Sequence, residues 1–206
     1  MKSELMAMVK TKHIYILRRR REGKTDYKKR KTVLMSKTTF ISPRITSKNI
    51  SVQILKATPQ GDRVLTSAYV HELYKLGWNG SGTSLPAAYL TGLTVGLKAS
   101  NLGIKKCVTY IGLRRYIHGS RISAVLKGVI DSGLEISEDT KTMPSKERIS
   151  GQHISMYAQS LLKIDKEKYK RMFSKRIEHG FKPEEYPKHF EDVKKKILEK
   201  YGAKKI

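Results

Sequence analysis

Apolar and polar positions alternate along the first third of the chain, which predicts a set of short strands. Residues 50–54 place isoleucine and valine on one face and serine and glutamine on the other, the pattern of a half-buried strand. Residues 40–46 carry two isoleucines on one face, and residues 63–69 supply a third strand. Between the last two strands, residues 58–62 read Thr-Pro-Gln-Gly-Asp, the composition of a turn. Because the connections are short, we expect the three strands to form an antiparallel meander.

A helix is predicted next, over residues 85–102. Ser84 precedes it as an N-cap, and Gly103 follows it as a C-terminal stop. Gly92 and Gly96 lie four residues apart and therefore on one face of this helix. A face without side chains would let another backbone approach closely.

A buried strand and a second helix complete the predicted core. Residues 106–113 form a nearly continuous apolar run, as expected of a central strand covered on both faces. Apolar residues then recur at helical spacing between residues 122 and 130, after Ser120 as a cap and before Gly133 as a stop. The element order is therefore β-β-β-α-β-α, which indicates an α/β fold with a single mixed sheet and helices packed against it.

The rest of the chain predicts further helices, over residues 146–162 and along an apolar stripe at residues 190–201. We therefore expect three parts: a basic arm at residues 1–38, the α/β core at residues 39–136, and a helical C-terminal extension at residues 137–206.

The net charge of +25, from 43 lysines and arginines against 18 aspartates and glutamates, indicates a polyanionic partner. The excess is uneven: residues 1–48 hold 15 basic and 3 acidic side chains, whereas residues 49–162 hold 13 and 7. Nucleic acid fits best, because lysine and arginine release condensed counterions from phosphates. The four consecutive arginines at 18–21 exceed what solubility requires, and neither helix nor strand geometry would bring all four to one protein surface. We interpret the arm as RNA-binding rather than as a solvated charge run.

The candidate RNA-binding residues lie in the arm and just after the predicted buried strand. They are Arg18, Arg19, Arg20, Arg21, Lys24, Thr25, Tyr27, Lys28, Lys29, Arg30, Arg114, Arg115, Ser120 and Arg121. The last four combine guanidinium groups with a helix start, which suits a phosphate, but solvated side chains at a strand end remain an open alternative. Among the tyrosines, Tyr15, Tyr27 and Tyr116 lie among basic residues and are candidates for base stacking, whereas Tyr89 and Tyr110 are expected in the core.

Residues 77–84, Gly-Trp-Asn-Gly-Ser-Gly-Thr-Ser, are similar to a phosphate-binding P-loop, but Thr83 stands where the lysine is required. Nucleotide hydrolysis is therefore excluded. Two readings stay open, a Gly/Ser turn ahead of a helix and a helix start whose amides contact an RNA phosphate.

Residues suited to metal binding or catalysis are sparse. The six histidines lack metal-ligand spacing and Cys107 is the one cysteine, so we expect no metal site, no intramolecular disulfide, no cofactor and a reducing cytoplasm. Asp62, Glu72 and Asp131 are scattered, so we expect neither an enzyme nor a small-molecule substrate. The longest apolar run, residues 86–97, is interrupted by threonine and glycine, so we expect no membrane span.

Several motifs resemble one ribosomal family. They are Arg-Arg-Arg-Arg-Glu-Gly-Lys-Thr-Asp-Tyr at 18–27, Pro-Ala-Ala-Tyr-Leu-Thr-Gly at 86–92, Gly-Ser-Arg at 119–121, Leu-Lys-Gly at 126–128, Asp-Ser-Gly-Leu-Glu-Ile at 131–136 and Pro-Ser at 144–145. In this order they resemble the large-subunit ribosomal protein numbered eighteen in bacteria and archaea and five in eukaryotes, with the archaeal branch nearer. The chain departs from the family at Arg114, where a histidine is expected, at residues 116–118, and after about residue 165.

The resemblance implies a ribonuclease-H-like core of the kind found in the translational machinery, without catalytic carboxylates. It implies binding to 5S rRNA, contacts with the large-subunit (23S-type) rRNA, and a neighbouring 5S-binding ribosomal protein at the central protuberance of the cytoplasmic ribosome. Family members begin shortly before the arm, so Met6 and Met8 are candidate starts. Two other hypotheses stay open. One is a different RNA-binding module, such as a tRNA- or ribosome-associated assembly factor, and the other is an RNA-processing enzyme on a ribonuclease-H-like core.

Overall fold

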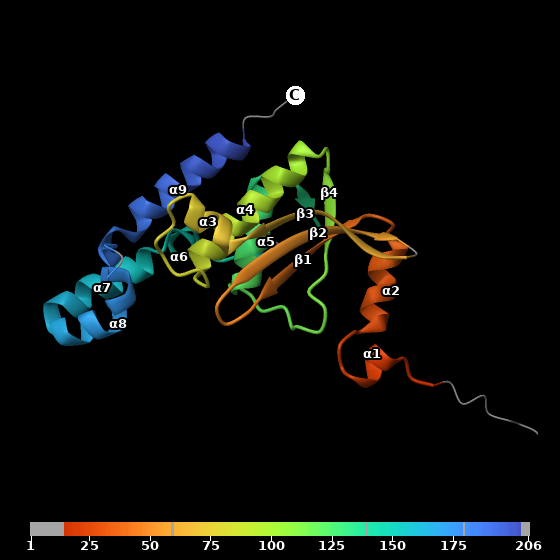
Figure 1. The fold of residues 1–206 in the computed structure, drawn as a ribbon, viewed down its shortest axis with the longest axis horizontal. Helices are drawn as coiled ribbons and strands as arrows, with labels where there is room; N and C mark the ends of the chain where they lie inside the picture. Colours follow the sequence, from red (N-terminus) through yellow and green to blue (C-terminus); the bar gives the residue numbers. More distant parts are fainter. Residues whose placement is uncertain (1–14, 59, 139, 179, 203–206) are drawn as a thin grey trace, which may run out of the picture.

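A computed structural model describes residues 15–58, 60–138, 140–178 and 180–202, and the candidate starts Met6 and Met8 lie outside them. Within this part of the chain one mixed sheet has the strand order β3-β2-β1-β4-β5 (Figure 1). The strands are β1 Thr39–Ile45, β2 Ile50–Thr58, β3 Gly61–Tyr69, β4 Lys106–Thr109 and β5 Glu135–Ile136. β1, β2 and β3 pair antiparallel, and β4 pairs parallel with both β1 and β5. The predicted meander and the single mixed sheet are confirmed.

The strand predicted over residues 106–113 is shorter in the structure. β4 pairs with β1 only from Cys107 to Thr109, and Gly112 then turns the chain with a φ of +66°. The apolar residues after Thr109 pack as a loop, which a run of apolar letters cannot distinguish from a strand. β5 was not predicted, because two residues are too few to show a period.

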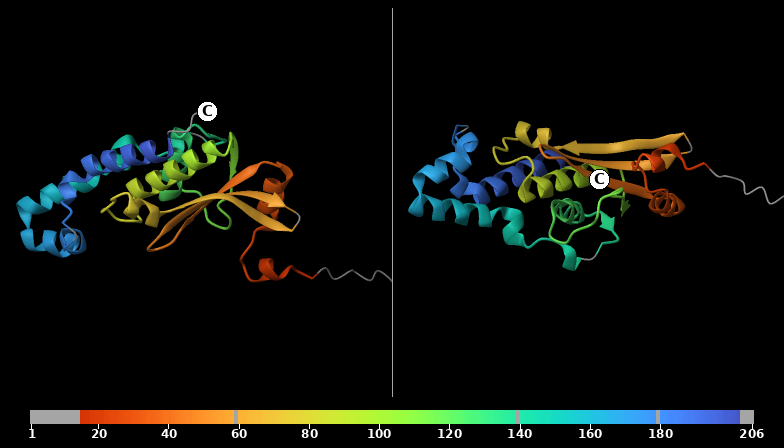
Figure 2. Two further views of the ribbon diagram at one scale, coloured as in Figure 1. Left: turned by 45° about the horizontal axis from the view of Figure 1, so that its top comes forward. Right: turned by 90° about the horizontal axis from the view of Figure 1, so that it is seen from below.

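Two helices cover one face of the sheet and cross at their glycines (Figure 2). They are α4 Leu85–Asn101 and α5 Arg121–Asp131. A Cβ on Gly92 would collide with the Val125 carbonyl group, and a Cβ on Gly128 would collide with the Tyr89 carbonyl oxygen. The expected close approach at Gly92 and Gly96 is confirmed, and Gly128 supplies the matching gap in the other helix.

The two predicted caps differ. Ser84 caps α4 through its hydroxyl, which accepts from the Ala87 amide at 3.4 Å. Ser120 occupies the N-cap position of α5 but makes no side-chain cap bond. Its hydroxyl is buried and has no hydrogen-bond partner among the described residues.

The C-terminal extension is helical, as predicted, but the helix expected over residues 146–162 is two helices. They are α6 Lys146–Ser150 and α7 Gln152–Ile164, followed by α8 Lys166–Glu178 and α9 Tyr186–Tyr201. Gly151 separates α6 from α7 with a φ of +81°, which glycine adopts easily. The predicted stripe of α9 is confirmed, since Phe190, Val193 and Ile197 are buried in the main core. Figure 1 shows α7 and α8 at the end of the molecule opposite to the arm.

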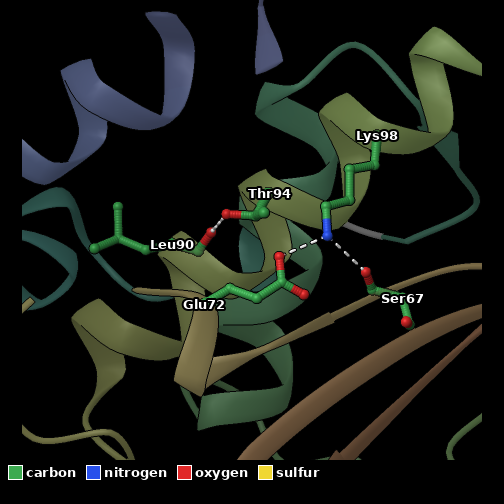
Figure 3. A network of polar contacts seen from close by, with 5 residues as sticks. All are labelled: Ser67, Glu72, Leu90, Thr94 and Lys98. Atoms are coloured by element: carbon green, nitrogen blue, oxygen red, sulfur yellow. Dashed lines mark hydrogen bonds and ion pairs between the residues drawn. The ribbon is translucent and has the colours of Figure 1, made fainter. Parts of the chain in front are cut away.

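Lys98 shows that not every cation faces solvent. This residue of α4 donates to Glu72 Oε2 at 2.6 Å and to the Ser67 carbonyl oxygen at 3.0 Å (Figure 3). Its ammonium also lies 5.3 Å from the ring centroid of Tyr201 in α9. Lys98 therefore ties α4 to β3, to α3 Val70–Lys75 and to the extension, and is unavailable to an RNA phosphate.

His189 fastens α9 to the loop before α4. Its Nε2 accepts a hydrogen bond from the Asn79 amide at 3.0 Å, and its ring stacks on Trp78 at 5.2 Å between centroids. Burial lowers the pKa of His189, and Lys196 adds to this while Asp192 opposes it. The neutral ring is the form that fits, because a protonated Nε2 cannot accept.

Acidification should therefore weaken the fold through His189. The pKa of His189 in the folded chain lies below its unfolded value of about 6.5. The stabilisation by the neutral ring is therefore complete above the unfolded pKa and is lost as the pH falls through the lower, folded pKa. Urea unfolding at pH 7.5 and pH 5.0 should show a larger loss of unfolding free energy in the wild type than in His189→Gln. The exposed His118→Gln is the control and should behave like the wild type. Equal pH dependence in all three chains would contradict the assignment.

Candidate nucleic-acid interface

Part of the basic arm is helical, which the sequence did not predict. The helices are α1 Arg18–Arg21 and α2 Tyr27–Met35. Asp26 caps α2 by accepting from the amides of Lys28 and Lys29 at 3.0 and 3.2 Å. Val33 packs with Phe40 and Leu55 in a small cluster separate from the main core. Phe40 and Ile41 are neighbours in β1 and point to opposite faces, so α2 lies on the sheet face opposite to α4 and α5.

The arm and the sheet enclose a groove of about 790 Å³. We call it the arm groove and define it by Arg19, Lys24, Thr25, Tyr27, Arg44, Tyr110 and Arg114, together with Arg30 and Asp62. These residues come from α1, the turn before α2, α2 itself, β1, the start of β3, and the segment after β4. A recess of this size is comparable with sites that hold small ligands, so it can receive a stretch of nucleic-acid backbone or a base.

The turn between α1 and α2 fixes two of the predicted residues in the groove. The amides of Lys24 and Thr25 donate to the Arg19 carbonyl oxygen at 2.8 and 3.2 Å. The Thr25 hydroxyl accepts from Arg19 Nε at 2.8 Å, which orients the guanidinium group. Gly23 allows this tight return with a φ of +61°. Arg19, Lys24 and Thr25 therefore form one local unit.

We expected from the sequence that the four consecutive arginines would not share one surface, and in the structure they do not. They occupy a single helical turn, in which successive side chains point about 100° apart. Arg19 lines the arm groove, whereas Arg18 pairs with Glu22 at 3.5 Å. All four are exposed, as are Lys28 and Lys29 on α2. Any RNA that contacts every one of them has to pass around α1.

Arg30 is held by the protein. Its Nη2 pairs with Asp62 Oδ1, and its guanidinium lies 5.1 Å from the ring centroid of Phe40 and 5.6 Å from that of Tyr110. The sequence placed Arg30 among the RNA contacts because its partners lie far away in the chain. In the structure its Nη2 is paired with a residue of β3, and its guanidinium packs against two aromatic rings.

The candidates after β4 are divided by the fold. Arg114 lines the arm groove, and Arg115 is exposed outside it. Arg121 Nη1 donates to the Thr83 carbonyl oxygen at 3.4 Å, which links the starts of α5 and α4. The Tyr116 hydroxyl shares a 2.9 Å hydrogen bond with Thr142, so this tyrosine is anchored. Arg114 and Arg121 therefore have different surroundings, the arm groove and the start of α4.

Sequence reasoning missed Arg44. It assigned Tyr110 to the core, and Tyr110 does pack against the small cluster that contains Val33 and Phe40, but it also lines the groove. Arg44 is exposed on β1 and lines the groove beside Ser42 and Thr46, while Tyr110 is half-buried and forms part of the wall. The available signal was the alternation in β1, since residues 40, 42 and 44 share the face opposite to Ile41 and Ile45. That face continues onto β2 and β3 as Gln53, Ser67 and an exposed Tyr69.

The Gly/Ser segment at 77–84 is a turn packed on the extension. A Cβ on Gly80 would meet the Trp78 ring at 2.5 Å and the Tyr186 hydroxyl at 2.7 Å. The Ser84 hydroxyl lies 3.1 Å from that of Tyr186, so α9 covers the start of α4. The glycines are needed for packing, and the turn reading is favoured over a phosphate contact.

The carboxylates considered for catalysis are each paired with a different cation. Asp62 pairs with Arg30, Glu72 with Lys98 at 2.6 Å, and Asp131 with Lys127 at 3.0 Å. Among the described residues, no group of three His, Cys, Asp or Glu side chains is placed to hold a metal ion. Within the same part of the chain, no helix has the length and apolar character needed to cross a membrane.

Comparison with known proteins identifies the family. A family model described as "Ribosomal large subunit proteins 60S L5, and 50S L18" matches residues 12–106, which include most of the arm and β1 to β3. The chain is 46% identical over 185 residues to "Large ribosomal subunit protein uL18" of Ignicoccus hospitalis, covering 89% of this chain and 90% of that relative. The chain belongs to the uL18 family. A uL18 protein of Caldivirga maquilingensis is 44% identical over 186 residues, 90% of each chain.

Membership of the uL18 family confirms the resemblance drawn from the motifs. The chain is a protein of the large ribosomal subunit, and uL18 is a family of ribosomal proteins rather than of enzymes. Both uL18 relatives are archaeal, in agreement with the predicted branch. An alignment of about nine tenths of the chain also extends beyond residue 165, so similarity to uL18 continues into the extension.

Proposed function

We propose that this uL18 protein binds 5S rRNA through the arm groove and attaches it to the large-subunit (23S-type) rRNA. The observation that carries the proposal is the convergence of Arg19, Lys24, Arg44 and Arg114 on one recess. These four cations come from three separate parts of the fold. The single carboxylate among the groove residues defined above is already paired with Arg30.

The groove chemistry suits a ribose-phosphate backbone. Guanidinium groups bind phosphate oxygens in bidentate fashion, and several of them around one recess follow a bent backbone better than a flat basic patch does. Tyr27 and Tyr110 offer ring edges or faces beside the cations, which suits an unstacked base. Arg44 and Arg114 form no ion pair within the described residues, so phosphates would not have to displace an acidic partner there.

The attachment to large-subunit rRNA is assigned to cations outside the groove. Arg20, Arg21, Lys28 and Lys29 are exposed and do not line the arm groove, and exposed lysines continue along α8 and α9. A chain with basic side chains on two sides can link two RNA segments. The position at the central protuberance, beside a neighbouring 5S-binding ribosomal protein, is inferred from the family resemblance.

Titration with 5S rRNA at several salt concentrations tests the proposal. If about ten phosphates are neutralised, the logarithm of the association constant should fall against the logarithm of salt concentration with a slope near −7 to −9. Arg44→Ala should lower the affinity and flatten the slope by about one. Arg63→Ala removes an exposed arginine of β3 outside the groove and is the matched control. A slope near −2 would mean that the basic surplus is not the binding surface. Equal affinity for an unrelated folded RNA of similar length would refute 5S rRNA as the specific ligand.

A further inference from the structure

We propose that Arg30 is a positioning residue rather than a phosphate ligand, and that the Arg30–Asp62 pair holds the RNA-binding arm in place before RNA arrives. The inference rests on the proposed function, because it concerns how the arm groove acquires its shape. It assigns a role to Asp62, an acidic side chain in the RNA-binding groove of a strongly basic protein.

The contacts of Arg30 are those of an anchor. Its side chain is 18% exposed and that of Asp62 is 31% exposed, so the ion pair is largely shielded from water. The Phe40 and Tyr110 rings meet edge to face with centroids 5.8 Å apart, and the Arg30 guanidinium lies within 6 Å of both centroids. A planar guanidinium can pair with a carboxylate at its edge and stack with aromatic rings on its faces, which an ammonium cannot do.

These contacts join segments that are distant in the chain. Arg30 belongs to α2, Phe40 to β1, Asp62 to the start of β3, and Tyr110 follows β4. The interaction therefore fixes α2 against the sheet at several points. Other anchors are few, because Val33 is the one buried residue of α2. A nine-residue helix is marginal by itself in water, so its order depends on this docking.

Docking of α2 determines where the basic groups of the groove lie. Lys24 lies in the turn before α2, and Tyr27 is the first residue of α2. On the other side of the groove, Arg44 belongs to β1 and Arg114 to the segment after β4. If α2 separates from the sheet, the two sides of the groove no longer face one another. A preformed groove avoids the ordering cost that a loose arm pays on binding, and the apparent affinity falls in proportion to the fraction of molecules that are correctly arranged.

Asp62 makes the inference testable, because a role as a plain charge and a role as a positioning partner predict opposite changes in RNA affinity. As a plain negative charge in the groove, Asp62 repels phosphates, so Asp62→Asn should strengthen binding to 5S rRNA. As the partner of Arg30, it holds the arm, so the same substitution should weaken binding although the protein becomes more positive. We expect Asp62→Asn to weaken binding about tenfold, the effect of losing one charge-assisted contact.

The matched control is Glu22→Gln, which likewise removes one carboxylate, here from the arm rather than from β3. Glu22 pairs with Arg18 and Lys24. Among the described residues it forms no ion pair with Arg30. It should bind 5S rRNA as tightly as the wild type or more tightly. A second comparison sets Arg30→Gln against Lys29→Gln, its exposed neighbour on α2. Lys29→Gln should flatten the salt dependence without loosening α2, whereas Arg30→Gln should loosen α2.

Hydrogen exchange of the free protein gives a readout independent of RNA. Amides of α2 should exchange faster in Asp62→Asn and Arg30→Gln than in the wild type, while amides of α4 should be unchanged, which shows that the core remains folded. Tighter RNA binding by Asp62→Asn, with unchanged exchange in α2, would overturn the inference. A wild-type chain that does not select 5S rRNA would refute the proposed function, and α2 exchange would then still decide whether Arg30 and Asp62 anchor the arm.

Discussion

Replacing Arg18, Arg19, Arg20 and Arg21 by alanine is expected to lower the affinity for 5S rRNA about 100-fold or more and to flatten the salt dependence by about three in slope. The four side chains are exposed on a single helical turn, so their removal leaves the sheet, the Arg30 anchor and the main core intact. Filter binding or fluorescence anisotropy at four or five salt concentrations gives both quantities. Circular dichroism should show a folded variant.

Lysine substitution of the same block separates charge from geometry. Four lysines keep the charge and therefore the slope, but they cannot form bidentate bonds to phosphate, so affinity should fall by about 1–3 kcal/mol. The structure sharpens this expectation, because Arg19 is the one member of the block that lines the arm groove. Arg19→Lys alone should therefore reproduce most of the loss, whereas Arg20→Lys should have little effect. Equal affinities for the two single variants and the wild type would mean that the block acts as diffuse charge.

The core was predictable because its signals are local and repeated. The alternation at residues 50–54 gave β2, and the helical spacing between residues 122 and 130 gave α5, since each places one face of an element in the main core. α2 was missed for the opposite reason. It buries Val33 and shows no apolar period, and it is held by the Asp26 cap and by Arg30. A helix fixed mainly by polar tertiary contacts has no periodic sequence signature.

The candidate site was predictable in composition but not in arrangement. The density of basic residues was enough to single out the arm as the candidate binding segment. Arg44 was missed because one arginine in a strand looks like an ordinary solvent-facing position. Arg30 was grouped with its basic neighbours because its partner Asp62 lies 32 residues away, and such a pairing has no local signal. Which cation meets RNA and which one meets protein is decided by the fold.

Substitutions at the close crossing of α4 and α5 should have a large effect on the free energy of unfolding rather than on RNA binding. A Cβ on Gly128 would collide with the Tyr89 carbonyl oxygen and lie 2.8 Å from the Leu93 amide nitrogen, and both atoms belong to the backbone of α4. Neither can move without shifting the helix, which carries the buried Leu90 and Leu93.

Gly128→Ala should therefore lower the free energy of unfolding by about 1–3 kcal/mol, because forced overpacking outweighs the helix propensity of about 1 kcal/mol that alanine gains over glycine. Gly96→Ala should cost less, since the shortest contact of its Cβ would be with the Ser132 hydroxyl, which can rotate away, while Ser132 Cβ at 2.8 Å and Val129 Cα at 3.3 Å would need a smaller shift. Ser100→Ala, at an exposed position of α4, is the control and should be neutral or slightly stabilising. Urea unfolding of the four chains gives the order. A Gly128→Ala chain as stable as Ser100→Ala would show that the two helices can separate without loss, and the close crossing would then not be what holds them together.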